Sequence, residues 1–476
     1  MTPAARLAAI DLGATSGRVI LGSVGPNELE LRQLARFPND PVPLRDGLHW
    51  NLLGLYRNAL DGLALAVREE PGLASVGIDS WAVDYALLHD GRMLGAPFHY
   101  RDPRRGAVGP PLVHEHVDAA ELYRRNGLQH LPFNTMFQLA CDRADGVLDG
   151  ADTMLLIPDL LVFELTGAIS AERTNASTTG LLDAATREWD EGLADTLGIP
   201  RRVLPPLVDP GTRIGMVSGA ALEVVGAPVP VTAVGSHDTA SAVVALPTTS
   251  DDIAYISCGT WGLVGVELAH PVLTDAARRA SFTNEGGVDG RVRFLHNVMG
   301  LWLLSECVRV WGEALPTLLE QAAAVQASVP VFDVDDPRFL APGDMPARIA
   351  DWLREHELPV PASRPALVRC IVESLAQAFA STVSVAASLS GAAVSAIHLV
   401  GGGAQNALLC QATADRSGLP VIAGPVEATA IGNLLVQARA VGAASGSLES
   451  LRALVAATQR PQTYTPTTTR KPVTHG

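Results

Sequence analysis

Two aspartates stand where apolar runs give way to small polar residues. Asp11 lies between LAAI and LGATSGR, and Asp238 lies in SHDTASAV after the β-rich run VPVTAVG. A carboxylate at such a turn can hold Mg²⁺ through water, and the glycines at 13 and 17 would let backbone amides approach phosphate oxygens. Aspartate near glycine is also ordinary turn chemistry, so the Asp11 segment alone leaves both interpretations open.

Ser236, His237, Asp238 and Thr239 stand just before small residues that can open a helix. The dipole at a helix N-terminus keeps a carboxylate ionised, which suits a group that accepts a proton. The alternative is a helix N-cap, a role that Asp238 or Ser236 could fill without any catalytic function.

Three consecutive glycines, residues 401–403, stand between a buried-type strand and a helix. They would let a ligand lie against backbone ahead of the positive end of a helix dipole, as nucleotides do. A tight structural turn is the alternative. Because three glycines exceed what a turn needs, we favour the nucleotide interpretation.

The elements that carry these residues repeat along the chain. Residues 6–24 read as strand, glycine turn and strand, and residues 251–268 repeat that design around Thr260. The pattern disfavours the strand-then-helix arrangement of Rossmann and Walker nucleotide sites. Two such hairpins suggest a duplicated architecture, although glycine-turn hairpins are common in α/β proteins.

Further segments predict strands over 74–88 and several helices. Asn51 is expected to cap a helix, and Gly391 to end a long one that starts at Arg364. A helix over 300–315 should bury one side, and the helix after the three glycines should hold Gln405 and Asn406 in its first turn. The expected buried side carries Leu301, Leu304, Val308 and Trp311.

Length and composition indicate a two-domain globular protein. At 476 residues, with 47% hydrophobic and 18% charged residues, the chain exceeds one ordinary core. We expect one domain over 1–246, a second over 247–460 and a frayed tail over 461–476. The net charge of −15 argues against nucleic acid or an anionic membrane as partner.

The cysteines and the N-terminus indicate where the protein acts. Five scattered cysteines without CxxC spacing fit neither a disulfide framework nor a zinc site. No export signal is apparent, and no apolar run approaches the length of a membrane span. We therefore expect a reduced, cytoplasmic protein.

Taken in order, eleven segments resemble the FGGY carbohydrate kinases of the actin-like ATPase superfamily, and within them the branch that acts on L-rhamnulose. The resemblance implies two actin-like (ribonuclease H-like) α/β domains, with mixed sheets flanked by helices and a central cleft. It also implies phosphoryl transfer from ATP, with Mg²⁺, to a small sugar. The segments are AIDLGATSGRVIL, GIDSWAVDYALL, HYRDPR, LPFNTMFQL, ERTNASTTGLLD, SHDTASAV, ISCGTWGLVG, FTNEGGVDG, NVMGLWLL, GGGAQNALLCQATAD and AGPVEATAIGN.

The same resemblance assigns roles to matching positions. Asp238 becomes the general base, with His237, Thr239 and Asn297 as sugar contacts. Asp11 becomes the Mg²⁺ residue, and Thr260 faces ATP. The remaining nucleotide contacts are Ala14, Thr15, Ser16, Gly17 and Arg18 at the phosphates and Gly402 and Gly403 at the adenosine.

Two positions depart from the family pattern. Ala82 stands where the family often has glycine, which adds a methyl group beside the sugar, and Ser305 stands where a glutamine can contact the nucleotide. Both leave the proton-transfer chemistry untouched and bear on preference for substrate. Other ketoses or polyols, such as L-fuculose, xylulose or glycerol, remain alternatives. A non-catalytic sensor on the same fold would be expected to lack the aspartates, whereas Asp11 and Asp238 are both present. The sugar-kinase segments around Asp238 argue against a bare ATPase of the actin or chaperone kind.

Overall fold

The computed structural model describes residues 3–467, which form two compact units. The first unit comprises residues 3–249, 267–294 and 428–459, and the second comprises residues 250–266, 295–427 and 460–467. The chain first leaves the first unit after Thr249, close to the predicted boundary at 246. The predicted second domain nevertheless contains two segments that fold with the first unit, among them the helices α16 (Ala428–Ala440) and α17 (Leu448–Thr458).

A mixed sheet with the order β12-β13-β6-β1-β2-β3 lies at the centre of the first unit. The hairpin predicted around Asp11 is confirmed as the antiparallel pair β1 and β2, which β3 continues. β6 runs parallel to β1, and β13 runs parallel to β6, so their carboxyl ends share one edge of the sheet. The strands are β1 (Ala5–Leu12), β2 (Ser16–Gly25), β3 (Glu28–Pro38), β6 (Ser75–Ser80), β12 (Arg213–Met216) and β13 (Pro230–Thr232).

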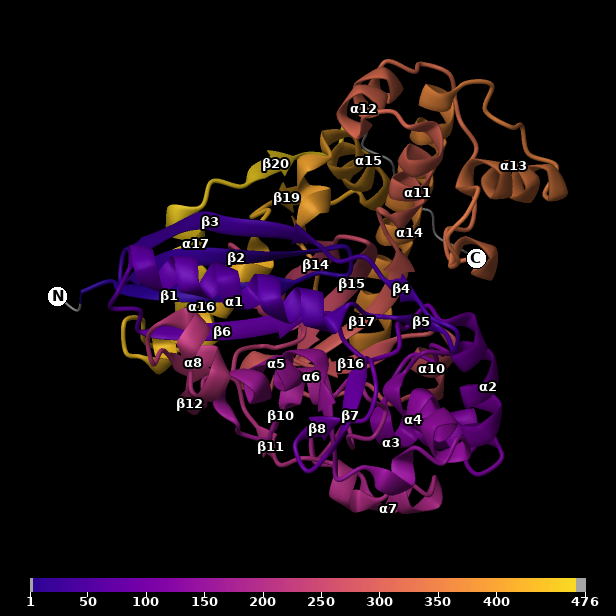
Figure 1. The fold of residues 1–476 in the computed structure, drawn as a ribbon. Helices are drawn as coiled ribbons and strands as arrows, with labels where there is room; N and C mark the ends of the chain where they lie inside the picture. Colours follow the sequence, from indigo (N-terminus) through magenta and orange to yellow (C-terminus); the bar gives the residue numbers. More distant parts are fainter. Residues whose placement is uncertain (1–2, 468–476) are drawn as a thin grey trace. The chain divides into compact units, whose positions relative to one another are not determined.

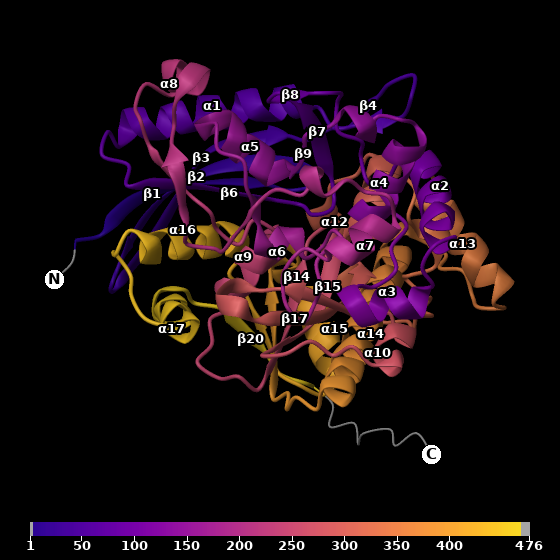
Figure 2. The ribbon, with the colours of Figure 1, turned by 90° about the horizontal axis from the view of Figure 1, so that it is seen from below.

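Helices α1 (Leu52–Glu69) and α16 cover opposite faces of this sheet, as Figure 2 shows. The side chain of Val19 packs against α1, where a Cβ on Gly62 would come within 2.4 Å of it. Three residues further along β2, a Cβ on Gly22 would come within 2.5 Å of Leu434 on α16. Because successive strand residues point to opposite faces, positions 19 and 22 face different helices. The predicted cap of α1 is confirmed, since Asn51 accepts a hydrogen bond from the Gly54 N–H.

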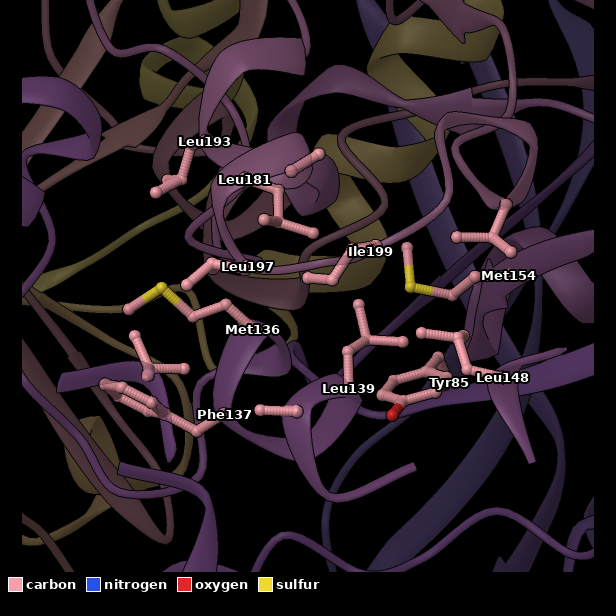
Figure 3. Packing of buried hydrophobic residues seen from close by; sticks show 14 of the residues in the cluster. Tyr85, Met136, Phe137, Leu139, Leu148, Met154, Leu181, Leu193, Leu197 and Ile199 are labelled. Atoms are coloured by element: carbon pink, nitrogen blue, oxygen red, sulfur yellow. The ribbon is translucent and has the colours of Figure 1, made fainter. Parts of the chain in front are cut away.

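A second core in the first unit holds the chain that follows β6. The small sheet β8-β7-β9 packs with α4 (Thr135–Ala144) around Phe137, Leu139, Met154 and Leu156, which are fully buried (Figure 3). The predicted strands over 74–88 are confirmed as β6 and β7 (Tyr85–His89), but β7 belongs to this small sheet. Between these two strands the chain therefore passes from one core to the other.

The second unit repeats the strand order of the first. The strands of this unit are ordered β17-β15-β14-β18-β19-β20, with β14 and β15 as the second predicted hairpin. Figure 1 labels each of these strands except β18. β18 is parallel to β14, β19 is parallel to β18, and β20 is antiparallel to β19. In the first unit the pairs β2–β1, β1–β6, β6–β13 and β13–β12 are likewise antiparallel, parallel, parallel and antiparallel. The expected duplication is therefore confirmed. The strands are β14 (Ile253–Cys258), β15 (Trp261–Leu268), β17 (Val292–Met299), β18 (Ala396–Val400), β19 (Val421–Ala423) and β20 (Gln462–Tyr464).

Three local predictions for the second unit were wrong. Residues 462–464 of the expected tail form β20, because they pair with the edge of β19. Residues 468–476 of that tail lie outside the described residues. Helix α11 (Trp302–Trp311) buries Leu303, Leu304, Glu306 and Cys307, because the carboxylate of Glu306 turns inward to accept a hydrogen bond from the Gly343 N–H. Asn406 caps α15 (Ala407–Ser417) instead of lying in its first turn, because the chain makes a separate 3₁₀ turn over Gly402–Gln405.

Helix α14 (Arg364–Ser390) ends at Gly391 in the left-handed conformation, as predicted. Within residues 3–467 it is the one helix long and apolar enough to cross a membrane by length and composition. This helix contradicts the expectation that no apolar run approaches the length of a membrane span. Of its most apolar 18-residue window, 56% is buried, and α14 packs against α12 (Leu315–Ala323) and α15, so core packing accounts for its composition.

The remaining elements connect these layers. In the first unit they are β4 (Val42–Pro43), β5 (Leu48–His49), β8 (Arg92–Met93), α2 (Pro103–His114), α3 (Ala119–Asn126), β9 (Thr153–Leu156), α5 (Ile157–Thr166), β10 (Ala171–Glu172), α6 (Arg173–Ala176), α7 (Glu191–Thr196), β11 (Leu207–Val208), α8 (Gly219–Val225), α9 (Asp238–Val244), α10 (Asp275–Arg279) and β16 (Thr283–Gly286). In the second unit, α13 spans Met345–Glu355.

The crossing of α16 over α9 gives a prediction about stability. A Cβ on Gly432 would lie 1.8 Å from the backbone oxygen of Ser241, which cannot swing aside as a side chain can. Gly432→Ala should therefore lower the free energy of unfolding by about 1–3 kcal/mol, the usual cost of overpacking. Urea and thermal unfolding measure the change. Gly72→Ala is the matched control, because nothing lies within 4 Å of its Cβ position; equal stability of the two variants would contradict the prediction.

Candidate active site

Two carboxylates lie side by side at the carboxyl ends of β1 and β6. Asp11 and Asp79 are direct partners in the parallel register, and they are 2% and 0% exposed. Arg18, the partner of Asp11 across the β1–β2 hairpin, brings its Nε to 3.1 Å from Asp11 Oδ2. The site therefore concentrates negative charge at one edge of the sheet, with one arginine against it.

Asp79 was not among the predicted site residues. Asn433 on α16 donates a hydrogen bond to its Oδ2 at 2.5 Å, while Oδ1 accepts none from the described residues. Burial, and then the charge of Asp11, raise the pKa of Asp79 well above its usual range, and the Asn433 hydrogen bond opposes this. The signal for Asp79 was present in the sequence, since GID at 77–79 ends an apolar strand in the same way as AID at 9–11.

The loop predicted to hold phosphate joins β1 to β2. Its shape is fixed by a hydrogen bond from the Gly13 N–H to the Ser16 oxygen at 3.0 Å and by Asn39, whose side chain donates to the Gly13 oxygen at 2.9 Å. Thr15 is exposed at the tip. Gly17 is buried, and a Cβ there would come within 2.2 Å of the Phe37 ring, so packing explains this glycine better than approach of a phosphate. Ala14, Ser16 and Arg18 are partly exposed beside it.

Asp238 is the first residue of α9, and its side chain is 31% exposed. The N-cap is His237, and it makes no side-chain capping bond. The alternative that Asp238 or Ser236 caps the helix was therefore wrong. Asp238 Oδ1 instead accepts a hydrogen bond from the Thr239 hydroxyl at 3.1 Å and lies 3.5 Å from Nε2 of His237.

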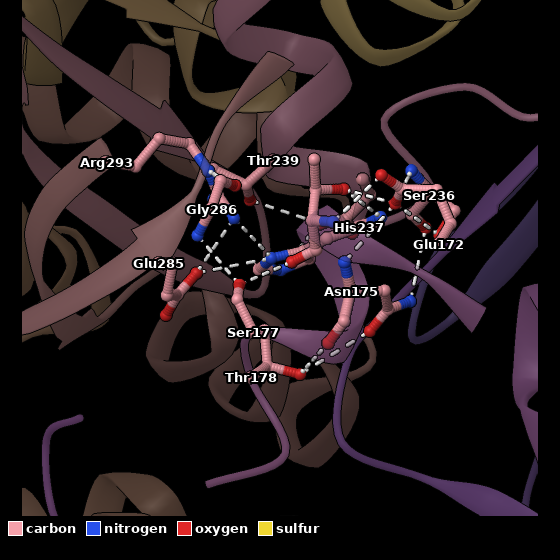
Figure 4. Close-up of polar contacts among 12 residues, drawn as sticks. Glu172, Asn175, Ser177, Thr178, Ser236, His237, Thr239, Glu285, Gly286 and Arg293 are labelled. Atoms are coloured by element: carbon pink, nitrogen blue, oxygen red, sulfur yellow. Dashed lines mark hydrogen bonds and ion pairs between the residues drawn. The ribbon is translucent and has the colours of Figure 1, made fainter. Parts of the chain in front are cut away.

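Glu172, which sequence reasoning missed, holds the segment before Asp238 (Figure 4). Its Oε2 accepts hydrogen bonds from the Ser236 N–H at 2.9 Å and from the Ser236 hydroxyl at 2.8 Å. It also binds the hydroxyl and N–H of Thr174 at the start of α6. Burial raises the pKa of Glu172, against the effect of these hydrogen bonds. The polar run ERTNASTT was the only sign of it in the sequence.

The imidazole of His237 has Asp238 on its Nε2 side and both Arg293 and Glu285 on its Nδ1 side. Its Nδ1 is 3.0 Å from Nη2 of Arg293 and 3.3 Å from Oε2 of Glu285 (Figure 4). Arg293 is 0% exposed and Glu285 is 6% exposed. Neither was predicted, because both come from a segment, 267–294, that is distant in sequence and returns to the first unit.

Ala82 lies in the turn between β6 and β7, which a buried carboxylate holds. Val83 has φ of 68°, a left-handed conformation that is strained for a β-branched residue, and its oxygen accepts a hydrogen bond from Thr135 at 2.6 Å. Asp84 is 1% exposed. Its oxygens accept hydrogen bonds from the side chains of Trp50, Trp81 and Gln138 and from the Tyr100 N–H, at 2.6, 3.2, 2.9 and 3.1 Å.

The three glycines of the second unit pack on the turn that carries Thr260. Gly401 has φ of 80°, and a Cβ on Gly403 would come within 2.5 Å of the Cys258 side chain, so the fold itself requires both glycines. The structural-turn interpretation thus explains these two positions. Gly402 differs, because it is exposed, its φ is not positive and the nearest atom to its Cβ position is 4.0 Å away. Room for a ligand remains an explanation for Gly402.

Ser305 and Asn297 lie on elements that adjoin the same turn. The carbonyl of Thr260 accepts a hydrogen bond from Trp302, the first residue of α11, at 3.2 Å. Ser305 is exposed one turn further along that helix. Asn297 is half-buried in β17, shortly before Gly300, whose Cβ would lie 2.5 Å from the Trp261 backbone.

The predicted residues therefore form two sets. The first unit brings together Asp11, Arg18, His237, Asp238 and Thr239, and adds the unpredicted Asp79, Glu172, Glu285 and Arg293. The second unit gathers Thr260, Gly402, Gly403, Ser305 and Asn297 around the β14–β15 turn. The first set can bind cations and accept protons, and the second offers backbone and hydroxyl groups.

Both halves match models of one family. Residues 7–245 match the N-terminal domain, and residues 254–441 match the C-terminal domain, of the FGGY family of carbohydrate kinases. The chain belongs to this family. It is similar to the rhamnulokinase of Bacteroides thetaiotaomicron, with 40% identity over 96% of this chain and 95% of that protein. The rhamnulokinase of Pectobacterium carotovorum is 43% identical over 92% of this chain and 88% of its own.

Solved structures confirm the predicted actin-like fold class. The xylulose kinase of Lactobacillus acidophilus superimposes with a TM-score of 0.76 over 97% of this chain and 94% of that chain, at 15% identity. Plasmodium falciparum glycerol kinase with ADP gives a TM-score of 0.77 over 98% and 94%, also at 15% identity. At this level of identity the likeness concerns the fold alone.

The turn that carries Ala82 gives a prediction about pH. Burial raises the pKa of Asp84 to about 7, against the lowering effect of its hydrogen bonds. Between about pH 4 and 7 the folded protein retains a proton that the unfolded chain has lost, so stability falls as pH rises through this window. Asp84→Asn removes the titrating group and should flatten this dependence, which amounts to at most about 1.4 kcal/mol per pH unit.

Urea unfolding of both proteins across this pH range measures the slope. Asp61→Asn, at an aspartate whose side chain is 64% exposed on α1, serves as the control and should keep the wild-type slope. An unchanged slope in Asp84→Asn would show that Asp84 is ionised throughout.

Proposed function

We propose that the protein is an ATP-dependent rhamnulokinase that phosphorylates the 1-hydroxyl of L-rhamnulose, giving L-rhamnulose 1-phosphate and ADP in the cytoplasm. The observation that carries this choice of substrate is the 40–43% identity, over more than nine-tenths of the chain, to proteins named rhamnulokinase. The carboxylates of the first unit supply the chemistry that such a reaction needs.

In this proposal Asp238 is the general base. Its carboxylate is partly exposed, it is free of a capping role, and Glu172 fixes the segment that carries it. As the sugar oxygen attacks the γ-phosphorus, Asp238 takes the hydroxyl proton and the bond to the bridging oxygen of ADP breaks. Phosphoryl transfer gains mostly from alignment and charge stabilisation, so the fixed backbone around Asp238 matters as much as its basicity.

The carboxylate edge suits Mg²⁺, which prefers oxygen ligands. The buried Oδ1 of Asp79 accepts no hydrogen bond from the described residues, and the Asp11 carboxylate lies on the adjacent strand. Asp11 would hold the ion, with Asp79 behind it. When bound, Mg²⁺ offsets negative charge on the phosphates of ATP.

The nucleotide contacts are proposed for both units. The loop of Ala14, Thr15, Ser16, Gly17 and Arg18 would meet the phosphates, where Arg18 adds a positive charge. Gly402 has open space above its backbone, which supports contact with adenosine, and Thr260, Gly403 and Ser305 lie around the same turn. Thr239, Asn297 and Ala82 are proposed at the sugar, and His237 lies beside them, 3.5 Å from Oδ1 of Asp238.

A substrate panel tests the function directly. ADP release is measured with Mg·ATP and L-rhamnulose, L-fuculose, D-xylulose, L-xylulose, L-ribulose or glycerol. A preference for L-rhamnulose is expected, and the methyl group of Ala82 is then a tolerated variation. A preference for another member would overturn the choice of sugar, and ADP release that no sugar stimulates would overturn the kinase assignment.

Asp238→Asn tests the proton acceptor. The amide cannot take the proton, so kcat should fall about 10²-fold or more while sugar and ATP still bind. Steady-state kinetics and calorimetric binding measure the two effects. Asp275→Asn is the matched control, because Asp275 is likewise the first residue of a short helix, α10, but is half-exposed. Near-normal turnover of Asp238→Asn would remove the residue from this role.

Asp11→Ala tests the cation site. Loss of the carboxylate should raise the Mg²⁺ concentration needed for half-maximal activity by about 10-fold or more. A Mg²⁺ titration at saturating ATP and sugar gives this value, with Asp61→Ala as the control for loss of an exposed aspartate. A titration that matches the wild type would place the cation elsewhere.

A further inference from the structure

A buried ion pair lies directly behind His237. Arg293 is 0% exposed; its Nη2 lies 3.1 Å from Oε2 of Glu285, and its Nε donates to the Gly286 oxygen at 2.9 Å. A buried cation persists only when it is paired and hydrogen-bonded, and Glu285 and Gly286 meet that need. The guanidinium is therefore held in one orientation.

The same Nη2 lies 3.0 Å from Nδ1 of His237 in hydrogen-bonding geometry (Figure 4). A guanidinium can only donate, so Nδ1 must accept, and the proton of a neutral imidazole then sits on Nε2. Glu285 Oε2 would favour the opposite tautomer, but it is further from Nδ1, at 3.3 Å. The arginine thus determines which nitrogen carries the proton.

The opposite side of the imidazole faces Asp238. Nε2 of His237 is 3.5 Å from Oδ1, and the Thr239 hydroxyl donates to this same oxygen at 3.1 Å. Among the described residues none donates a hydrogen bond to Oδ2. Catalytic hydrogen bonds are often long before substrate binds, so the 3.5 Å contact is compatible with a donor that tightens in the complex.

We propose that Arg293 and Glu285 are positioning residues that fix His237 with its proton on Nε2, so that His237 and Thr239 hold Oδ1 of Asp238 and leave Oδ2 as the atom that accepts the sugar proton. The inference rests on the proposed role of Asp238 as base. The proton passes from the sugar hydroxyl to Oδ2 as the oxygen–phosphorus bond forms, and ADP leaves with the electrons of the broken bond. His237 keeps its own proton throughout.

This assignment differs measurably from that of a sugar contact. Glutamine can place an N–H near the position of Nε2, whereas asparagine reaches only the position of Nδ1. His237→Asn should lower kcat by about 10-fold or more while the KM for sugar changes little, and His237→Gln should restore most of the turnover. If His237 mainly contacts sugar, the KM for sugar rises in both variants, which would overturn the proposal.

The tautomer of His237 can be measured by NMR, independently of any activity assay. In ¹⁵N-histidine-labelled protein, the resonances of His237 are assigned as those lost in His237→Gln. The Nε2–H form is expected in the wild type, and its loss is expected in Arg293→Lys, which keeps the charge but offers one donor group for three partners. If Arg293→Lys fails to fold, Glu285→Gln tests the same point, because it removes the carboxylate that favours a proton on Nδ1. The Nε2–H form is expected to persist in this variant, and an Nδ1–H form there would also overturn the proposal.

An Nδ1–H tautomer in the wild type overturns the proposal whatever the substrate. Failure of the proposed function looks different, since it appears as sugar-independent ADP release in the wild type or as normal turnover of Asp238→Asn.

Discussion

Repulsion between Asp11 and Asp79 is the constraint around which the first unit is organised. Parallel pairing of β1 with β6 fixes two buried carboxylates next to each other, and the fold cannot separate them without breaking the sheet. Arg18 and Asn433 relieve part of the cost from either side. A bound cation would favour the ionised form of both carboxylates, so this edge of the sheet is suited to a cation. The chemistry of the site thus depends on the register of two strands.

Buried carboxylates also shape the loops around this edge. Glu172 accepts hydrogen bonds from the backbone N–H groups of Ser236 and Thr174. Asp84 accepts hydrogen bonds from two indoles, a side-chain amide and a backbone N–H. Each acid pays a desolvation cost, visible in a raised pKa, and each holds a turn that carries a proposed site residue. An apolar residue of equal size could fill the space but could not satisfy the N–H groups of these turns.

The sequence supported prediction wherever the signal was local. Both hairpins, Asp11, Asp238 and the glycine turn follow from short patterns of apolar and small residues, and the duplication follows from the spacing of the hairpins. Asp79 carried the same local signal as Asp11 and was overlooked. Glu285, Arg293 and Asn433 could not be found this way, because their significance comes from contacts with residues far away in the chain. The three glycines show the converse limit, since a pattern typical of nucleotide sites arises partly from packing on Cys258.

The return of residues 428–459 to the first unit has a consequence for synthesis. The strands β1, β2 and β6 are made first, but the face of their sheet that α16 covers stays uncovered until the ribosome has nearly finished the chain. The nascent protein therefore carries an open apolar surface through most of translation, which is the kind of surface that chaperones bind. A fragment that ends at the boundary between the two family domains would lack this helix, and its sheet would be left half-covered.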